Sequence, residues 1–66
     1  MRLTVNGKLF ETSGAETLAG LLGELAVESG HVAVMVNELI IRRADYLSFR
    51  LKENDTIEIV NFVGGG

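Results

Sequence analysis

The stretch TLAGLLGELAVESG, residues 17–30, is the strongest indication of the fold, because its apolar residues recur at the period of a helix. Spacings of i, i+3, i+4 and i+7 place four leucines on one helical face: Leu18, Leu21, Leu22 and Leu25. We expect Thr17 to cap the start of the helix and Gly30 to end it in the left-handed conformation. The stretch therefore predicts a helix over residues 18 to 28, with an apolar face that a second layer must cover.

Before this helix the apolar period is two. The opening residues, MRLTVNGKLFE, alternate apolar and polar side chains around an Asn-Gly pair at 6–7, which is a strong hairpin signal. A two-residue turn there would pair Leu3 with Phe10 and Thr4 with Leu9 across the two strands. Phe10 then joins the core face of the sheet, and Leu9 becomes a candidate exposed apolar residue.

After the helix, the chain predicts three more strands. They are a buried, central strand at 32–36, a short strand at 39–41 after a turn at 37–38, and a final strand at 56–63 after a turn at 54–55. The connection between the last two strands is expected to hold one helical turn around 45–47. This order predicts an α+β domain in which one main helix packs on one face of a mixed sheet of four to five strands. We expect residues 1–63 to form a single domain and residues 64–66 to form a flexible glycine tail.

Composition fits a single small domain and excludes several kinds of site. The chain has 66 residues, 47% hydrophobic and 23% charged, which suits one packed core. It has no cysteine and one histidine, so disulfides and thiol nucleophiles are excluded and a metal site is not expected. The net charge is -3 and the arginines are not gathered with aromatic residues, so no nucleic-acid binding is expected. The lack of a leader or a long apolar run predicts a cytoplasmic protein that contacts no membrane.

The final strand gives the sheet a second, partly apolar face. Period-2 alternation turns Ile57 and Ile59 toward the helix and the residues between and after them away from it. The predicted outward residues, candidates for partner docking, are Glu58, Val60 and Phe62, joined on the same face by Leu9 and Thr4. Exposed apolar residues beside a tail often mark a docking surface, although scattered ones are common on any protein.

The order of these elements, together with LKENDTIEIVNFVGGG at 51–66, resembles the ThiS family of ubiquitin-like β-grasp proteins, the sulfur carriers of thiamine biosynthesis. The similarity spans essentially the whole chain. Its most specific parts are VNELIIRRADY at 36–46 and the Gly-Gly pair at 65–66. The sequence departs from the family pattern in two places: Ile41 stands where the family often has proline, and Asn54 where it often has glycine. Neither departure touches the glycines.

The resemblance implies chemistry that other enzymes perform on this chain. In the family, an E1-like adenylyltransferase of the ThiF type uses MgATP to adenylate the carboxylate that corresponds to Gly66. Sulfur from a persulfide, carried by a donor such as a cysteine desulfurase, then converts it to a thiocarboxylate, which thiazole synthase of the ThiG type receives. Gly64 and Gly65 would enter the partner's active site with Gly66, because residues without a Cβ fit a narrow passage. The chain itself would bind no cofactor, catalyse no reaction and remain monomeric when free.

Two further carrier functions stay open at this point. A molybdopterin-synthase small subunit has the same tail, and a ubiquitin-like modifier would be joined to lysines through Gly66. Arg42 matches a basic position of the family and is a candidate contact residue, as is its neighbour Arg43, although a solvated pair of arginines is equally common. His31 is assigned no role, since no nucleophile or second ligand is expected beside it.

Overall fold

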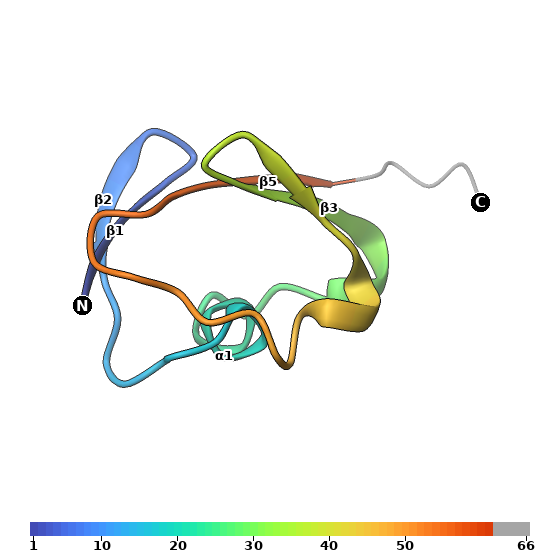
Figure 1. Ribbon diagram of the computed structural model, residues 1–66, viewed down its shortest axis with the longest axis horizontal. Coiled ribbons are helices and arrows are strands. Elements are labelled where there is room, and N and C mark those ends of the chain that lie inside the picture. The colour runs from blue at the N-terminus through green and yellow to red at the C-terminus, as the bar shows by residue number, and fades with distance from the viewer. Residues whose placement is uncertain (62–66) are drawn as a thin grey trace.

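The structure, a computed structural model, describes residues 1–61 and shows a five-stranded sheet with one α-helix against it (Figure 1). The strands are β1 (Arg2–Val5), β2 (Lys8–Glu11), β3 (Val32–Val36), β4 (Leu39–Ile41) and β5 (Thr56–Asn61), and the helix is α1 (Leu18–Glu24). Two 3-10 turns, η1 (Ser29–His31) and η2 (Arg43–Asp45), complete the fold. The predicted α+β architecture is confirmed. The expectations for residues 62–66, including Phe62 and the glycine tail, lie outside the described residues.

The sheet is mixed and β5 is its central strand. Its order is β2-β1-β5-β3-β4, in which β1 and β5 are parallel and the other neighbours antiparallel. The predicted hairpin register is confirmed, since Leu3 pairs with Phe10 and Thr4 with Leu9. Both hairpin turns contain two residues with positive φ, at 6–7 and 37–38, as the right-handed twist of the strands requires.

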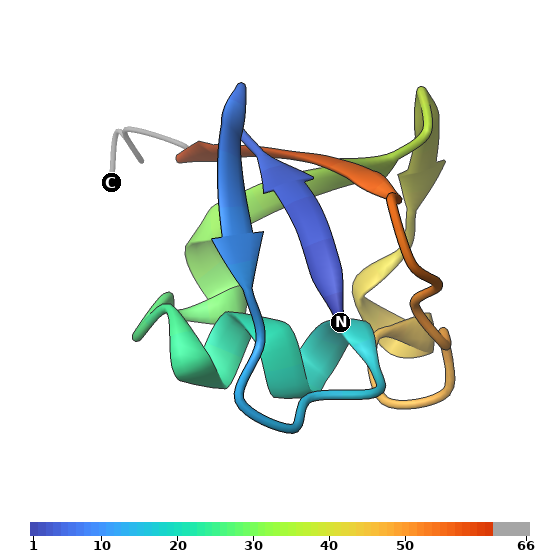
Figure 2. The ribbon, with the colours of Figure 1, turned by 90° about the vertical axis from the view of Figure 1, so that its left-hand side faces the viewer.

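The helix α1 lies across one face of the sheet, below it in Figure 2. Thr17 is its N-cap as predicted, because its Oγ1 accepts a hydrogen bond of 3.1 Å from the Gly20 N–H. The leucine stripe enters the core: Leu18, Leu21 and Leu22 are buried, and Leu25 packs against them. Ile57 from β5 is fully buried and Ile59 half-buried on the same side of the sheet, also as predicted.

The predicted end of the helix is wrong by four residues. α1 ends at Glu24, and Ala26, not Gly30, takes the left-handed conformation with φ of 57°. The Val27 N–H donates to the Leu22 carbonyl and the Ala26 N–H to the Gly23 carbonyl, which is the Schellman arrangement of a helix end. This early stop lets Val27 pack against the core. Gly30 lies in η1 instead.

The connection after β4 differs slightly from its prediction. The helical turn expected at 45–47 begins two residues earlier, as η2, because the Asp45 N–H already donates to the Arg42 carbonyl at 2.8 Å. Tyr46, the next residue, is buried, and its carbonyl accepts a bond from the Ala19 N–H of α1. Burial raises the pKa of the Tyr46 phenol, and the positive charge of Arg43 opposes that rise.

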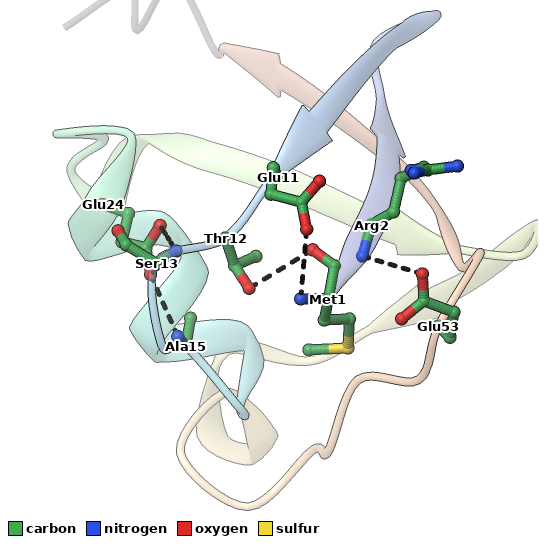
Figure 3. Close-up of polar contacts among 8 residues, drawn as sticks. All are labelled: Met1, Arg2, Glu11, Thr12, Ser13, Ala15, Glu24 and Glu53. Atoms are coloured by element: carbon green, nitrogen blue, oxygen red, sulfur yellow. Dashed lines mark hydrogen bonds and ion pairs between the residues drawn. The ribbon is translucent and has the colours of Figure 1, made fainter.

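Carboxylates tie the loops to this frame. Glu24 of α1 accepts hydrogen bonds of 3.0 Å from the backbone N–H groups of Ser13 and Ala15, and Glu53 accepts one of 3.1 Å from Arg2 (Figure 3). The buried Asp55 accepts bonds from the Asn37 side chain and the Lys52 backbone at 2.9 and 2.8 Å. Asn37 thereby joins the β3–β4 turn to the start of β5, and Asn54 has the positive φ predicted for that turn.

Replacing Ala26 with glycine tests the helix end. A left-handed alanine costs about 1–2 kcal/mol, and glycine removes this strain. Part of the gain is offset because glycine gives the unfolded chain more conformational entropy. We expect Ala26→Gly to raise the free energy of unfolding by about 0.5–1 kcal/mol in urea denaturation. The matched change inside α1, Ala19→Gly, should lower it by about 1 kcal/mol. A destabilised Ala26→Gly variant would contradict the assigned helix end.

Candidate functional site

Four of the predicted docking residues, Thr4, Leu9, Glu58 and Val60, lie on the sheet face opposite α1, as expected. Thr4 pairs with Leu9 on one side and with Thr56 on the other, so these side chains share a face with the two alternating positions that follow Thr56 in β5. The side chains of Leu9 and Val60 are 75% and 55% exposed, and Glu58 between Thr56 and Val60 is also exposed. We call this surface the outer face.

The pairing of β3 adds three apolar residues to the outer face that the sequence interpretation missed. Ala33 pairs with Val60, and Met35 pairs with Glu58 on one side and with Ile40 of β4 on the other. Ile40 is 70% exposed, whereas Ala33 and Met35 are half-buried. The outer apolar patch therefore consists of Val60, Ala33, Met35 and Ile40. The apolar run at 32–36 predicts a strand buried throughout, but the two-residue turn after it also places Met35 opposite Ile40, on the outer face.

The two residues predicted from the first hairpin share the outer face but not this patch. Leu9 and Thr4 lie beside Thr56 at the start of β5, while Val60 is near its end. The expectation of one apolar surface running from Leu9 to Val60 is therefore wrong within residues 1–61. The parallel pairing of β1 with β5 causes this, because it sets Thr4 level with the first residue of β5.

Acidic side chains border the outer apolar patch. A hollow of about 390 Å³ on this face is lined by Glu38 and Glu58 together with Met35, Asn37 and Thr56, with no lysine or arginine among them. Coulomb attraction between unlike charges would favour a partner surface that presents a basic group here.

Arg42, by contrast, follows β4 at the edge of the sheet. Its side chain is 80% exposed, and its Nε lies 3.6 Å from an Asp45 carboxylate oxygen. Such an exposed pair contributes little stability, so Arg42 stays available for contact. His31 is an exposed surface residue whose Nδ1 lies 3.1 Å from a carboxylate oxygen of Glu28.

The segment that leads to the glycines is held by a side chain that the sequence interpretation treated only as part of a turn. Asn6 has a φ of 50°, its backbone N–H donates to the Ile57 carbonyl at 2.9 Å, and its Oδ1 accepts a bond of 2.7 Å from the Ile59 N–H. The tip of the first hairpin thereby clamps the second half of β5, just before the residues predicted to enter a partner. The predicted tail residues Gly64, Gly65 and Gly66 lie outside the described residues.

No three His, Asp or Glu side chains of residues 1–61 lie close enough together to hold a metal ion. None of the helices in this range is long and apolar enough to cross a membrane.

Comparison with known proteins places this chain in a family. The sequence model of the ThiS family matches residues 3–66. The chain belongs to the ThiS family. It is 38% identical to the sulfur carrier protein ThiS of Bacillus subtilis over 65 residues, covering 97% of this chain and 98% of that protein. The crystal structure of the thiamine biosynthesis protein ThiS from Geobacter metallireducens superposes with a TM-score of 0.84 at 36% identity and covers both chains completely. The resemblance stated from the sequence, and the β-grasp fold it implies, are confirmed.

A second group of relatives consists of longer proteins. The chain is 41% identical over 66 residues to a thiazole synthase of Paramagnetospirillum magneticum, but it spans only 20% of that protein's length. A thiazole synthase of Magnetococcus marinus matches in the same way, at 38% identity and 20% of its length. A segment similar to this ThiS-family chain therefore occurs within longer proteins named thiazole synthase.

Variants of Asn6 test the clamp on β5. Asn6→Gly keeps the left-handed backbone but removes the acceptor, and should lower the free energy of unfolding by about 1 kcal/mol. Asn6→Ala also introduces left-handed strain and should cost about 2–3 kcal/mol, whereas Asn6→Asp retains an acceptor oxygen. Hydrogen exchange at the Ile59 amide should be accelerated in the Gly and Ala variants and stay slow in the Asp variant. Unchanged Ile59 protection in Asn6→Gly would show that the clamp is not formed.

Proposed function

We propose that this chain is a sulfur carrier of thiamine biosynthesis and that it carries sulfur as a thiocarboxylate on Gly66. The observation that supports this most strongly is the match of the ThiS family model through residue 66, on a chain that also covers 98% of the Bacillus subtilis carrier. The fold favours the same function, because the central strand β5 runs toward the glycines and ends beside an exposed apolar patch.

The carboxylate of Gly66 is a poor electrophile, so the proposed chemistry begins with its activation. An oxygen of the Gly66 carboxylate attacks the α-phosphate of MgATP in an E1-like adenylyltransferase of the ThiF type, and pyrophosphate leaves. The terminal sulfur of a persulfide, formed by a donor such as a cysteine desulfurase, then attacks the acyl carbon and AMP leaves. A thiol reduces the resulting acyl disulfide, so the thiocarboxylate stays on Gly66. In this cycle the chain is a substrate of enzymes and supplies no catalytic group of its own.

Thiazole synthase of the ThiG type is the proposed acceptor of this sulfur. The proposal is supported by the thiazole synthases that contain a segment similar to this chain, since joining a carrier to the enzyme that consumes its sulfur raises their effective concentration. A carrier that is a separate protein needs a docking surface for the same purpose.

The outer apolar patch is the proposed docking surface, together with Glu58 and Arg42 beside it and with Leu9 and Thr4 farther along the outer face. Its position explains how a small chain offsets the cost of ordering its glycines in a partner's active site, which is about 1–2 kcal/mol per residue fixed. Burying Val60 and Ile40 would return roughly 1.5–3 kcal/mol for each side chain that becomes fully covered. The carboxylates of Glu38 and Glu58 in the hollow would orient this chain on its partner by attracting a basic group of the partner surface.

The proposed function predicts where sulfur appears. After incubation with an E1-like adenylyltransferase, MgATP, a desulfurase and cysteine, fragmentation mass spectrometry should localise one oxygen-to-sulfur replacement on Gly66. Fragmentation is required because oxidation of Met1 or Met35 adds nearly the same mass. Deleting Gly66 or replacing it with valine should abolish loading and leave thermal unfolding unchanged. Sulfur on the truncated chain, or an unchanged terminus beside a carrier that the same enzymes load, would contradict the proposal.

Exposed apolar residues on and off the patch provide a matched test of docking. Val60→Asp and Ile40→Asp each place a charge in the outer apolar patch and should raise the KM for loading about tenfold or more, because a buried charge without a partner is costly. Leu47→Asp changes a side chain that is 81% exposed outside the patch and should leave the KM unchanged. Equal KM values for all three variants would exclude the patch as the docking surface.

A further inference from the structure

One backbone edge of the sheet is left open next to the proposed tail. The pairing of β1 with β5 covers Thr4 with Thr56 and Val5 with Ile57, and β1 then turns away at Asn6. On the opposite side, β3 pairs with β5 as far as Asn61. Among residues 1–61, the last residues of β5 therefore have a strand neighbour on one side only.

The hydrogen-bonding groups at this edge follow from the alternation of an antiparallel ladder. The Asn37 N–H donates to the Thr56 carbonyl, so residues 56, 58 and 60 exchange bonds with β3, while residues 57, 59 and 61 direct their N–H and C=O groups to the β1 side. The contacts on that side agree: the Ile57 carbonyl accepts from Asn6, and the Ile59 N–H donates to the Asn6 side chain.

The Asn6 side chain stands where the next carbonyl of β1 would have been, and it occupies the Ile59 N–H. The Ile59 carbonyl and the N–H and carbonyl of Asn61 come after it. Within residues 1–61 no partner from β1 reaches these three groups, and Asn61 is exposed. They form a short open edge of one acceptor, one donor and one acceptor in sequence order. An open edge of this kind can be extended by another strand.

We infer that the Ile59–Asn61 edge of β5 pairs with an extended segment of the adenylating enzyme, which continues the sheet on the side that β1 vacates. The inference rests on the proposed function, because that function brings the adenylating enzyme to this end of the molecule. Gly66 is five residues beyond Asn61, so its carboxyl group lies within about 17–18 Å of Asn61 even when the chain is fully extended. An enzyme surface that encloses Gly66 must therefore approach the open edge closely.

Side chains next to the edge fit such a strand. Val60 projects from the outer face and is 55% exposed, while Ile59 is half-buried on the inner face. A strand added here would place alternate side chains over Val60 and beside Ile59, so an enzyme segment with apolar residues at alternate positions is the expected complement. Backbone pairing would also fix the direction in which β5 leads the glycines into the active site.

A proline at position 61 tests the open edge with little disturbance of the fold. Asn61→Pro removes the one N–H donor of the edge, and that N–H takes no part in the pairing with β3. Asn61→Ala keeps the N–H and loses only the side chain. With an adenylyltransferase that loads the wild-type chain, Asn61→Pro should raise the Kd about three- to tenfold, the effect of one lost hydrogen bond. Asn61→Ala should bind like the wild type.

Two further variants separate loss of the Asn61 N–H from damage to the fold. Val60→Pro removes an N–H that pairs with β3 and should lower the thermal midpoint, whereas Asn61→Pro should leave it unchanged. A semisynthetic chain with a backbone ester in place of the Asn61 amide removes the N–H without a proline ring and should show the same weaker binding. In the wild-type complex, hydrogen exchange at the Asn61 amide should be slowed at least tenfold.

The outcomes separate the two proposals. If the enzyme does not load the wild-type chain, the proposed function fails. If the wild type is loaded and both the proline and the ester chains bind with unchanged Kd, only the strand pairing is overturned. A change confined to self-association of the free chain would assign the edge to a second copy and would likewise overturn the inference.

Discussion

The structure depends on the parallel pairing of β1 with β5, which brings strands from opposite ends of the sequence together at the centre of one sheet. Each hairpin is local, but neither can bury its apolar side alone; a central β5 joins them into a surface wide enough for the leucine stripe of α1. The same pairing stops at Ile57, where Asn6 turns β1 away, so the second half of β5 pairs with β3 alone within the part of the chain that the structure describes. The core and the proposed presentation of the glycines therefore depend on the same strand.

Local signals predicted much of this fold because they act within a few residues. The Asn-Gly turn fixed the first register, and the leucine spacing with Thr17 fixed the start and the buried face of α1. The helix end escaped prediction because it depends on tertiary packing: Val27 packs against the core when Ala26 takes an unfavourable left-handed backbone, and glycine preference alone pointed to Gly30. At Ala26, core packing therefore outweighs the residue's preference against a left-handed backbone.

The candidate site was only half predictable for the same reason. Alternation within β5 placed Glu58 and Val60 on the outer face, but the partners of Val60 across the sheet depend on which strands are neighbours. Pairing with β3 and β4 brings Met35 and Ile40 into the patch, and parallel pairing with β1 takes Leu9 out of it. The function of Asn6 as a clamp follows from a contact with Ile59, 53 positions away in the sequence, which no local pattern contains.

In the proposed function, this small domain presents one carboxyl group, which carries sulfur to thiazole synthase. A chase of labelled sulfur can follow that transfer. The chain is loaded with heavy-isotope sulfur, separated from the desulfurase and the adenylating enzyme, and given to thiazole synthase with its other substrates. We expect the label to leave Gly66 and appear in the thiazole ring, with the carrier recovered as a carboxylate. Label that stays on Gly66, or a thiazole that forms with unlabelled sulfur only, would contradict it.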